Sequence, residues 1–576
     1  MPKFLREFFN RSELTQRLYT LRKEFIVAAI FTAVINVLML TPTLYMLQLF
    51  DRVLMSYSLF TLIALSLVAL FFFVVSGFSQ WIRSKLLIRT GVKLDKSLNP
   101  RVFKAAFESR LNQSKHKANI NNTPTQAFDD LIAVRQFMTG NGFFAFMDAP
   151  WSPIYIIVLF LLHPLLGVLS LVFSAILIGI ALYTGGRQHK PLEFSGKTGF
   201  RLNLYSQSKM KNLAVVEAMG MRDKLRSLWR EKLDYFVGIN GTAHDISAKM
   251  QGITKFATMC QQSLTLAAGA ILVIKGDLTA GSMIAANVLM GRVTQPLMIL
   301  VSTWKQTLTV RDAFLRLEKL LKDYPEKSAG FVGVVPSGNV SVKNLTATAE
   351  GRAENNPILN NISCDFVAGN VIAIVGSSGA GKSTFARCLV GIWANCILKN
   401  PTSDGVLYDQ EPISHWDRND LGQWIGYLPQ DVELFEGTIA ENVARFGEVD
   451  AQKVIKACQR AGVHEMILRF PQGYDTNIGL AGSHLSGGQR QRIGLARALY
   501  GDPSIVVLDE PNANLDDAGE KALEMAILDL KARHKTVFLI THRQNILQCA
   551  DKIMRVQNGK ILDVSEEFSA IKKLQN

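Results

Sequence analysis

The residues best suited to chemistry lie in a glycine-rich stretch in the second half of the chain. Residues 371–384 read VIAIVGSSGAGKST, so an aliphatic run typical of a buried parallel strand passes into a glycine loop that ends in lysine and serine. Glycines let backbone N–H groups close around phosphate oxygens, and the positive end of a following helix favours the same anion. The pattern predicts a nucleoside triphosphate site at Gly376, Ser377, Ser378, Gly379, Ala380, Gly381, Lys382, Ser383 and Thr384.

A second aliphatic run ends in two carboxylates. Residues 505–510 read IVVLDE, and we expect Asp509 to hold Mg²⁺ through water and Glu510 to accept a proton from the water that attacks the γ-phosphate. In the glycine loop, Lys382 is expected to neutralise phosphate charge and Ser383 to ligate the same Mg²⁺. The loop alone leaves kinases, helicases, GTPases and transporters open.

Two polar residues at other strand ends are candidates for the same site. Gln430 follows YLP and is predicted to reach the Mg²⁺ and the attacking water. His542 follows VFLIT, and we expect it to contact the γ-phosphate from the end of that strand. The predicted catalytic set is therefore Glu510, His542 and Gln430.

A second anion-binding helix start is indicated at residues 485–489, which read LSGGQ and precede the helical run RQRIGLARAL. Two glycines and a serine before a helix favour phosphate binding. A lone glycine loop does not need such a second phosphate-binding segment. We therefore expect the nucleotide to lie between two copies of the chain. The predicted contacts are Ser486, Gly487, Gly488 and Gln489.

The first half of the chain is apolar and basic. Hydrophobic residues make up 48% of the chain, and six long apolar runs predict transmembrane helices at 25–50, 53–82, 143–162, 165–183, 256–274 and 283–304. The first run is 26 residues long and shows no cleavage pattern, which favours a retained helix over a signal peptide. The tight turn between the first two helices is expected at Asp51 to Ser58.

The charge distribution argues against a nucleic-acid partner. The formal net charge is +15, but residues 1–330 carry 39 Lys and Arg against 20 Asp and Glu, and the remainder carries 24 against 28. Positive charge confined to the membrane half is typical of cytoplasmic loops. We expect both termini in the cytoplasm, and two cytoplasmic connections, 83–141 and 187–249, built from helices that continue past the bilayer as elbows. The alternative is solvated loops with no mechanical role.

Two charged residues lie inside apolar runs, where charge is costly and usually functional. Arg292 is midway along the sixth run, and Asp148 lies in the third, beside Pro150 and Pro153. Our hypothesis is that Arg292 faces a transport path or a partner subunit, near Asp148. The alternatives are an interfacial charge that reaches the membrane surface and a buried pair that only fixes helix packing.

A linker separates the two halves. An amphipathic helix is predicted at 311–322, and residues 324–337 supply proline, glycine and serine. We expect a six-helix transmembrane domain with long cytoplasmic elbows at 1–323, a linker at 324–337 and a nucleotide-binding domain at 338–576.

Taken in order, GSSGAGKS, the YLPQ glutamine, LSGGQRQR, VVLDEP, NLD and the THR histidine resemble the ATP-binding cassette of ABC transporters. The resemblance implies an α-helical membrane domain of six transmembrane helices, of the ABC exporter type, fused to an α/β P-loop ATP-binding cassette. It implies a homodimer in which Ser486 and Gly488 of one chain face the ATP held by the other, with Asp516 linking the two sites. ATP and Mg²⁺ are the implied cofactors.

The membrane half resembles a particular branch. LMLTPTLYMLQLFDRVL, MDAPWSPIY, GRVTQP and DEPNANLD are similar to the protease and lipase exporters of type I secretion systems. That branch implies a multi-pass protein of the bacterial inner membrane, embedded in membrane lipid, that exports an unfolded polypeptide with a C-terminal signal. Its implied partners are a periplasmic adaptor and an outer-membrane channel, with no nucleic acid.

Three alternatives and three departures remain. The alternatives are a flippase for lipids or small amphiphiles, a tethered cassette ATPase acting on DNA or ribosomes, and an ATP-gated channel. The departures from the family pattern are the lack of an adenine-stacking aromatic residue in 344–356, Leu480 where exporters carry glutamate, and an unusual insert at 394–404.

Overall fold

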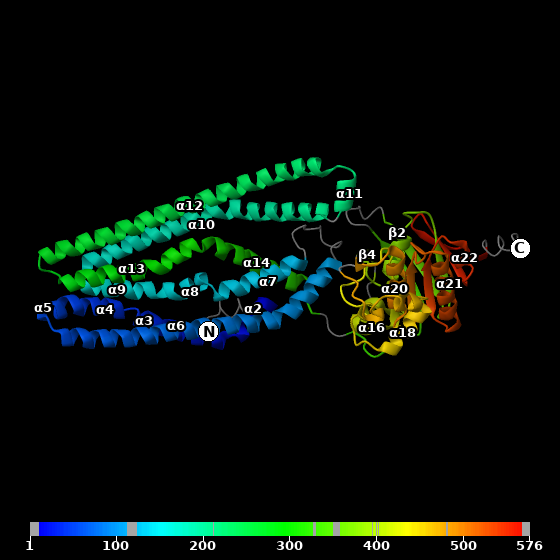
Figure 1. Cartoon of the computed structure of the whole chain (residues 1–576), viewed down its shortest axis with the longest axis horizontal. Helices are drawn as coiled ribbons and strands as arrows, with labels where there is room; N and C mark the ends of the chain where they lie inside the picture. The colour runs from blue at the N-terminus through cyan, green and yellow to red at the C-terminus, as the bar shows by residue number, and fades with distance from the viewer. Residues whose placement is uncertain are drawn as a thin grey trace. The chain divides into compact units, whose positions relative to one another are not determined.

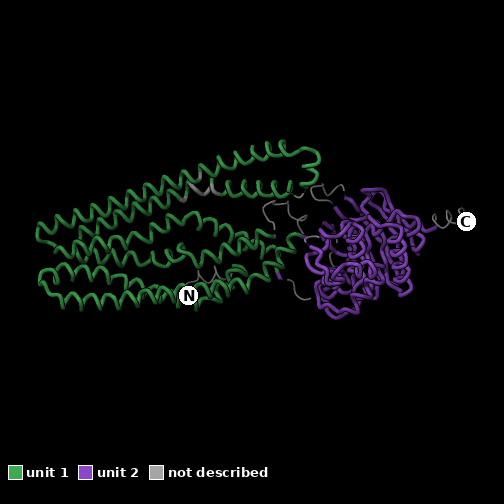
Figure 2. The backbone as a smooth tube through the Cα atoms, in the orientation of Figure 1, with its two compact units in different colours: residues 1–110, 119–325 green, residues 111–118, 326–576 purple. Residues whose placement is uncertain are grey.

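The chain forms two compact units, shown in green and purple in Figure 2. The computed structural model describes residues 11–111, 124–210, 212–326, 330–348, 357–393, 395–398, 400, 403–479 and 482–566. Unit 1 contains the described residues up to Pro325, apart from Leu111, and unit 2 contains Leu111 and those from Glu326 onward.

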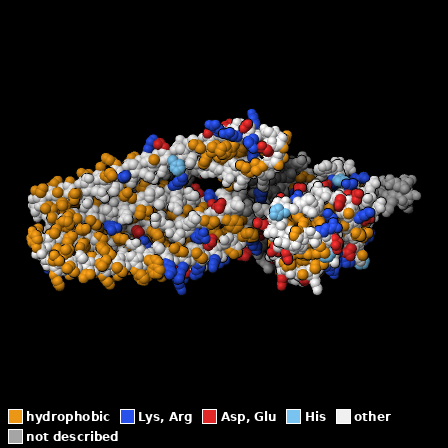
Figure 3. Space-filling model, in the orientation of Figure 1, with side chains coloured by type: hydrophobic (Ala, Val, Ile, Leu, Met, Phe, Trp, Pro, Cys, Tyr) orange, Lys and Arg blue, Asp and Glu red, His pale blue; other side chains and the backbone are white. Residues whose placement is uncertain are grey.

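Unit 1 is entirely helical in its described part (Figure 1). Six helical segments are long and apolar enough to cross a membrane, which confirms the predicted number of spans. They are Arg22–Ser56, Leu59–Leu111, Asn141–Leu162, Pro164–Thr184, Arg222–Ile274 and Ala280–Ser302. Hydrophobic side chains cover the end of unit 1 that holds α4 and α5 (Figure 3). Phe60 and Leu161 are 83% and 82% exposed, which suits lipid rather than water.

The first crossing differs from the prediction of one helix to Phe50 followed by a turn. It consists of α3 (Arg22–Leu38), α4 (Thr41–Gln48), a π-helical turn (Leu49–Val53) and α5 (Leu54–Ser56). Pro42 stands at the start of α4, where a missing N–H is tolerated. The chain therefore reverses only at Tyr57, which has a left-handed φ of 49°, and Ser58, before α6 begins at Leu59.

The helices continue well past the membrane, as expected for elbows. The helices α6 (Leu59–Leu111), α10 (Pro164–Met210) and α12 (Arg222–Ile274) have 53, 47 and 53 residues. At about 1.5 Å per residue, a helix of this length spans roughly 70–80 Å, more than twice the ~30 Å hydrocarbon core. Short α11 (Leu213–Ala218) joins α10 to α12. The described residues of these connections are therefore largely helical, and their mechanical role stays a prediction.

The third crossing changes its helix type where its prolines lie. It runs through α8 (Asn141–Asp148), a 3₁₀ turn (Ala149–Trp151) and α9 (Ser152–Leu162). Pro150 and Pro153 each stand at the start of their helical segment, where proline does not remove a helical hydrogen bond.

The last crossing is α13 (Ala280–Ser302), and α14 (Trp304–Asp323) leads out of the membrane. The outer half of α14 packs with α2 (Glu13–Thr20), α6 and α7 (Pro124–Thr139) around a cluster that includes Leu14, Leu98 and Leu317. Two ion pairs reinforce it. Arg316 donates to both oxygens of the Asp130 carboxylate, at 2.8 and 2.6 Å, and Arg101 Nε donates to Glu13 at 3.0 Å.

Unit 2 is built on two sheets. A six-stranded sheet has the order β11-β10-β3-β9-β8-β7, and a second sheet has the order β2-β1-β5-β6, with β4 paired to β1. The strands are β1 (Val340–Ala347), β2 (Leu359–Phe366), β3 (Val371–Val375), β4 (Cys396–Ile397), β5 (Gly405–Tyr408), β6 (Glu411–Pro412), β7 (Ile425–Leu428), β8 (Ile505–Asp509), β9 (Thr536–Ile540), β10 (Lys552–Gln557) and β11 (Lys560–Asp563).

Helices surround the six-stranded sheet. They are α15 (Lys382–Leu389), α16 (Arg418–Trp424), α17 (Ile439–Val443), α18 (Ala451–Arg460), α19 (His464–Leu468), α20 (Gly487–Leu499), α21 (Asp517–Ala532) and α22 (Gln544–Leu547). Successive residues of β8 alternate between two apolar cores, with Val506 in one and Val507 in the other. The strands β3, β8 and β9 are buried along their whole length, as expected for parallel strands covered on both faces.

Candidate nucleotide-hydrolysis site

The glycine loop joins β3 to α15 in the conformation that its sequence requires. Gly379 and Gly381 have φ values of 77° and 106°, in the region that favours glycine. A Cβ at Gly376 would come within 2.5 Å of the Val556 carbonyl oxygen. Lys382 Nζ donates to the carbonyl oxygens of Gly376 and Ser377 at 2.8 and 2.9 Å, so it crosses the loop. Burial lowers the pKa of Lys382 because the ammonium charge is costly to bury. A phosphate beside it would offset that cost.

Ser383 and Asp509 lie together at the ends of α15 and β8. Ser383 Oγ donates to Asp509 Oδ1 at 3.2 Å. Asp509 is 1% exposed, and its Oδ2 is buried with no hydrogen-bond partner among the described residues. Burial raises the pKa of Asp509, and the hydrogen bond from Ser383 opposes that shift only in part. An unpaired buried carboxylate oxygen beside a hydroxyl is the donor set that a hard cation requires.

The donor set fits Mg²⁺ held jointly with a nucleotide. Among the described residues, no group of three or more His, Cys, Asp or Glu side chains surrounds one point. Ser383 and Asp509 would therefore hold Mg²⁺ with phosphate oxygens and water as the remaining ligands, as is usual for this ion. The amide oxygen of Gln430 is a further neutral donor.

The three predicted catalytic residues converge. Gln430, just after β7, donates from Nε2 to Glu510 Oε2 at 2.9 Å. His542, just after β9, places Nε2 at 4.0 Å from Glu510 Oε1. Glu510 has a left-handed φ of 47°, and its backbone N–H donates to the Ile540 carbonyl at 3.0 Å. Backbone strain in a residue at the end of a buried strand is typical of a functional position.

One residue at this site was missed by the sequence analysis. Gln491 lies on α20, is 3% exposed, and donates from Nε2 to the carbonyl oxygens of Glu510 and Pro511, both at 3.4 Å. It therefore ties the helix that follows LSGGQ to the backbone of the predicted base. The signal was available, because Gln491 shares a helical face with the buried Leu495 and Ala498.

The LSGGQ segment starts α20 as expected. Ser486 Oγ accepts from the backbone N–H of Gln489 at 3.2 Å, and Gln489 Oε1 accepts from the N–H of Ser486 at 2.8 Å. This reciprocal pair caps the helix. A Cβ at Gly488 would come within 2.6 Å of the Asn514 carbonyl oxygen. Asp516 caps α21 by accepting from the Gly519 N–H at 2.9 Å. Among the described residues, no hydrogen bond joins 486–489 to the glycine loop of the same chain.

In the membrane unit, Asp148 has a different partner from the one suggested by sequence. Arg83 Nη1 donates to Asp148 Oδ1 at 2.9 Å and to Thr32 Oγ1 at 3.3 Å. Asn36 Nδ2 also donates to Asp148 Oδ1, at 3.1 Å, and Tyr155 donates to the Asn36 carbonyl at 2.8 Å. This network joins α3, α6, α8 and α9. Arg83 is the first residue of the predicted cytoplasmic connection 83–141, for which no partner was expected, and in the structure it is 7% exposed.

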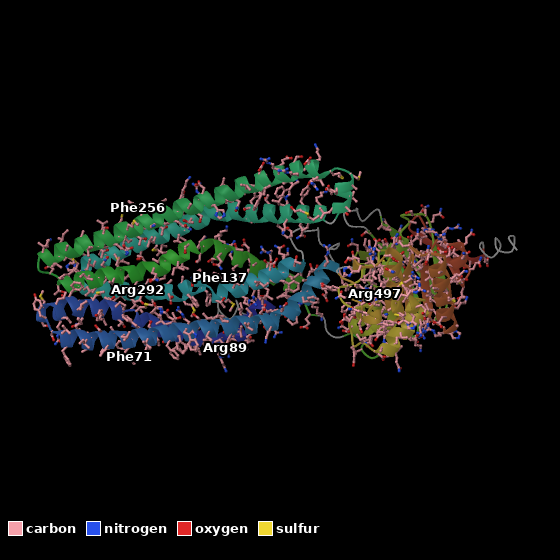
Figure 4. All side chains as sticks on the ribbon, viewed as in Figure 1. Phe71, Arg89, Phe137, Phe256, Arg292 and Arg497 are labelled. Carbon is pink, nitrogen blue, oxygen red and sulfur yellow. The ribbon has the colours of Figure 1, made fainter. Side chains whose placement is uncertain are left out.

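Arg292 does not pair with a carboxylate among the described residues. Its Nη1 lies 3.3 Å from Gln295 Oε1 on the same helix, α13 (Figure 4). Its role in a transport path stays a prediction. Three other predictions fall wholly or partly outside the described residues: the missing adenine-stacking residue, because 349–356 are not described, Leu480, and the insert, of which 394, 399, 401 and 402 are not described.

The fold and the site together define an ATP-binding cassette in unit 2 and an exporter-type helical membrane region in unit 1. The family model "ABC transporter" matches residues 359–513, and "ABC transporter transmembrane region" matches residues 25–297. The chain is 37% identical over 542 residues to the type I secretion system ATP-binding protein PrsD of Rhizobium meliloti (strain 1021), with 94% of this chain and 91% of that protein covered.

Two further comparisons agree. The chain is 27% identical to the toxin RTX-I translocation ATP-binding protein of Actinobacillus pleuropneumoniae, over 94% of this chain and 75% of that protein. A bacterial Atm1-family ABC exporter with ATP bound has a similar fold, with a TM-score of 0.79, 20% identity and coverage of 96% and 98% of the two chains. The chain belongs to the ABC transporters and, within them, to the type I secretion ATP-binding proteins. It is an ATPase and a multi-pass protein of the inner membrane.

Proposed function

We propose that two copies of the chain form an ATP-driven exporter of a type I secretion system, which moves an unfolded polypeptide with a C-terminal signal across the inner membrane. The observation that carries the proposal is the convergence of Gln430, Glu510 and His542 beside Ser383 and Asp509, in a chain that matches a type I secretion protein along 94% of its length. A periplasmic adaptor and an outer-membrane channel are the proposed partners, and both termini are proposed to be cytoplasmic.

Each residue has a proposed task in hydrolysis. The glycine loop and Lys382 bind the phosphates, and Ser383 and Asp509 hold Mg²⁺, which supplies charge neutralisation at the γ-phosphate. Glu510 accepts the proton of the attacking water, while Gln430 orients both the water and the Glu510 carboxylate. His542 is directed at the γ-phosphate.

The second copy completes the site in this proposal. Ser486 and Gly488 start a helix whose N–H groups favour an anion, and in the described residues this helix start makes no hydrogen bond to its own glycine loop. Two ATP molecules would therefore be bound between the glycine loop of one chain and the LSGGQ of the other, with Asp516 near the junction. Closure of this dimer would move the helical elbows, and hydrolysis would reopen it.

The Glu510→Gln variant tests the proposed base. Turnover should fall by at least about 100-fold while ATP still binds, because only proton acceptance is removed. Glu465→Gln, an exposed carboxylate on α19, is the matched control and should hydrolyse ATP normally. Unchanged turnover in Glu510→Gln would remove Glu510 from this role.

Export itself requires a reconstituted system with adaptor and outer-membrane channel. Wild type should move a polypeptide with a C-terminal signal, and Glu510→Gln should not. The flippase alternative predicts a different result: small amphiphiles would stimulate ATP hydrolysis and be moved without any adaptor. That outcome would replace the protein-export proposal.

A further inference from the structure

The cytoplasmic extension of unit 1 contains an open cleft that the hydrolysis site does not use. The cleft lies between α10 and α12, has a volume of about 710 Å³, and is lined by Phe194, Arg201, Tyr205, Glu231, Lys232 and Tyr235, among others. Its volume is in the range of ligand-binding sites. In Figure 3, hydrophobic side chains over this part of α10 and α12 are flanked by Lys and Arg together with some Asp and Glu.

Two hydrogen bonds between the helices bracket the cleft. Ser195 Oγ donates to Asn240 Oδ1 at 3.1 Å on one side, and Trp229 Nε1 donates to Ser206 Oγ at 3.1 Å on the other. Hydrogen bonds between α10 and α12 therefore hold the two helices together at both ends of the cleft. From residue 194 to 205, α10 advances about 16 Å, which matches roughly five residues of an extended chain at 3.3 Å each.

The cleft presents aromatic faces and positive charge. Phe194 and Tyr235 contact each other edge to face, with ring centroids 6.4 Å apart, and are 49% and 59% exposed. Lys209 and Lys232 each place Nζ over the Tyr205 ring, at 5.4 and 5.3 Å. Aromatic rings held this way hold the ammonium groups in place through cation–π attraction.

The cleft is lined by two positive side chains, Arg201 and Lys232, and one negative side chain, Glu231. Neither Arg201 nor Lys232 forms an ion pair with a carboxylate in the part of the chain that the structure describes. Residues 187–249 contain 12 Lys and Arg against 6 Asp and Glu. The cleft therefore suits an occupant that carries negative charge together with apolar side chains.

Lipid headgroups are a poor candidate for this occupant. The apolar span of α10 ends at Thr184, and the cleft begins ten residues later. At 1.5 Å per residue, the cleft lies about 15–30 Å beyond the end of the span, whereas the headgroup layer on each side is only about 5–8 Å thick.

We propose that this cleft binds an extended, acidic segment of unfolded polypeptide, with carboxylates on Arg201 and Lys232 and an aromatic or aliphatic side chain against Phe194 and Tyr235. The occupant's identity as cargo rests on the proposed function, and the cleft gives that cargo a docking place on the cytoplasmic extension. A short acidic and aromatic peptide is sufficient to test it.

The probe is a fluorescently labelled pentapeptide, Glu-Phe-Glu-Phe-Glu, with Lys-Phe-Lys-Phe-Lys as the charge-reversed comparison. Binding to the full chain in detergent is measured by anisotropy. We expect Arg201→Glu/Lys232→Glu to weaken binding of the acidic peptide at least tenfold, and added salt to weaken binding to wild type. The matched control, Lys224→Glu/Arg226→Glu, changes the same charge on exposed positions of α12 and should bind within twofold of wild type.

Equal losses in both charge-reversed variants would show general attraction to a basic surface and overturn the proposal, as would no loss in either. If Arg201→Glu/Lys232→Glu fails to fold, Arg201→Gln/Lys232→Gln replaces it. Loss of self-association in the cleft variant, with the control still dimeric, would show that a second copy covers the cleft, and would also overturn it. Export assays separate the two proposals: if wild type exports no polypeptide but the peptide binds as expected, only the proposed function fails.

Discussion

The two units place their polar residues in opposite ways. In unit 2, the residues around Glu510 stand at the ends of neighbouring parallel strands, so the backbone places them. In unit 1, Arg83 and Asp148 meet across 65 residues of sequence, and side-chain packing of long helices places them. The difference is that a strand end fixes a polar residue locally, whereas a charge in a helix bundle depends on which neighbour faces it.

The largest effect should come from the cassette, where the place that suits Asp509 for Mg²⁺ binding lowers the stability of the fold. Asp509 is buried with one oxygen unpaired. A carboxyl pKa raised in the folded state contributes stability at low pH that is lost as the pH rises, so ionised Asp509 costs stability at neutral pH. Asp509→Asn should lower the rate of ATP hydrolysis by about 1,000-fold. It should also raise the melting temperature of the nucleotide-free chain by about 2–4 °C if roughly 1 kcal/mol is recovered.

Calorimetry and ATP hydrolysis on the same samples check both parts. Asp517→Asn, at the exposed start of α21, is the control and should leave hydrolysis within about twofold. A variant that is both inactive and less stable would mean that Asp509 has a structural partner. That result would contradict the claim that its buried carboxylate costs stability.

Unit 1 should show the reverse pattern, because Arg83 and Asp148 are paired. Arg83 is buried and Asp148 is half-buried, so Arg83→Met leaves a partly desolvated carboxylate without its partner, which should cost about 2 kcal/mol of unfolding free energy. Arg83→Met/Asp148→Leu removes both charges and should recover most of that loss. The double-mutant cycle is measured by denaturing the detergent-solubilised chain and monitoring the loss of helix by circular dichroism. Additive losses would show that the pair is not coupled.

These two cases show which parts of the structure can be predicted from sequence. The spans, the long elbows, and the strands that precede Lys382, Glu510 and His542 follow from local patterns of hydrophobicity and glycine. The ion pair of Arg83 with Asp148 could not be predicted, because Arg83 begins a basic segment and nothing local shows which residue of another helix faces it. The turn after Phe50 was drawn too long for a similar reason, since π-helical geometry has no clear sequence signal.

A smaller effect should come from Gln491, which acts on the site through Glu510. Gln491→Leu keeps the shape of the buried side chain but removes the donor to the Glu510 carbonyl. We expect kcat to fall about tenfold with KM for ATP unchanged, because about 1.4 kcal/mol of positioning is lost without loss of nucleotide contacts. Gln491→Asn should be similarly impaired, since its amide is one methylene short. A rise in KM alone would assign Gln491 to nucleotide binding instead.

The smallest effect should come from the π-helical turn of the first crossing, where a residue of unit 1 is fixed by local backbone contacts, as in unit 2. Asp51 accepts hydrogen bonds from Thr279 Oγ1 at 2.6 Å and from the Gly281 N–H at 2.8 Å, so it caps α13 from another helix. A Cβ at Gly281 would come within 2.5 Å of Asp51 Oδ1. Gly281→Ala should therefore displace the carboxylate and cost about 1 kcal/mol, the usual value of a helix cap.

The Asp51→Ala background decides whether the cap is the cause. Once the carboxylate is gone, Gly281→Ala no longer displaces it, and alanine is the better helix former. In that background the same substitution should be neutral or slightly stabilising. If it costs as much as in wild type, the loss comes from crowding elsewhere on α13. The π-helical turn would then be held by side-chain packing, as the rest of unit 1 is, and not by the contact of Asp51 with the start of α13.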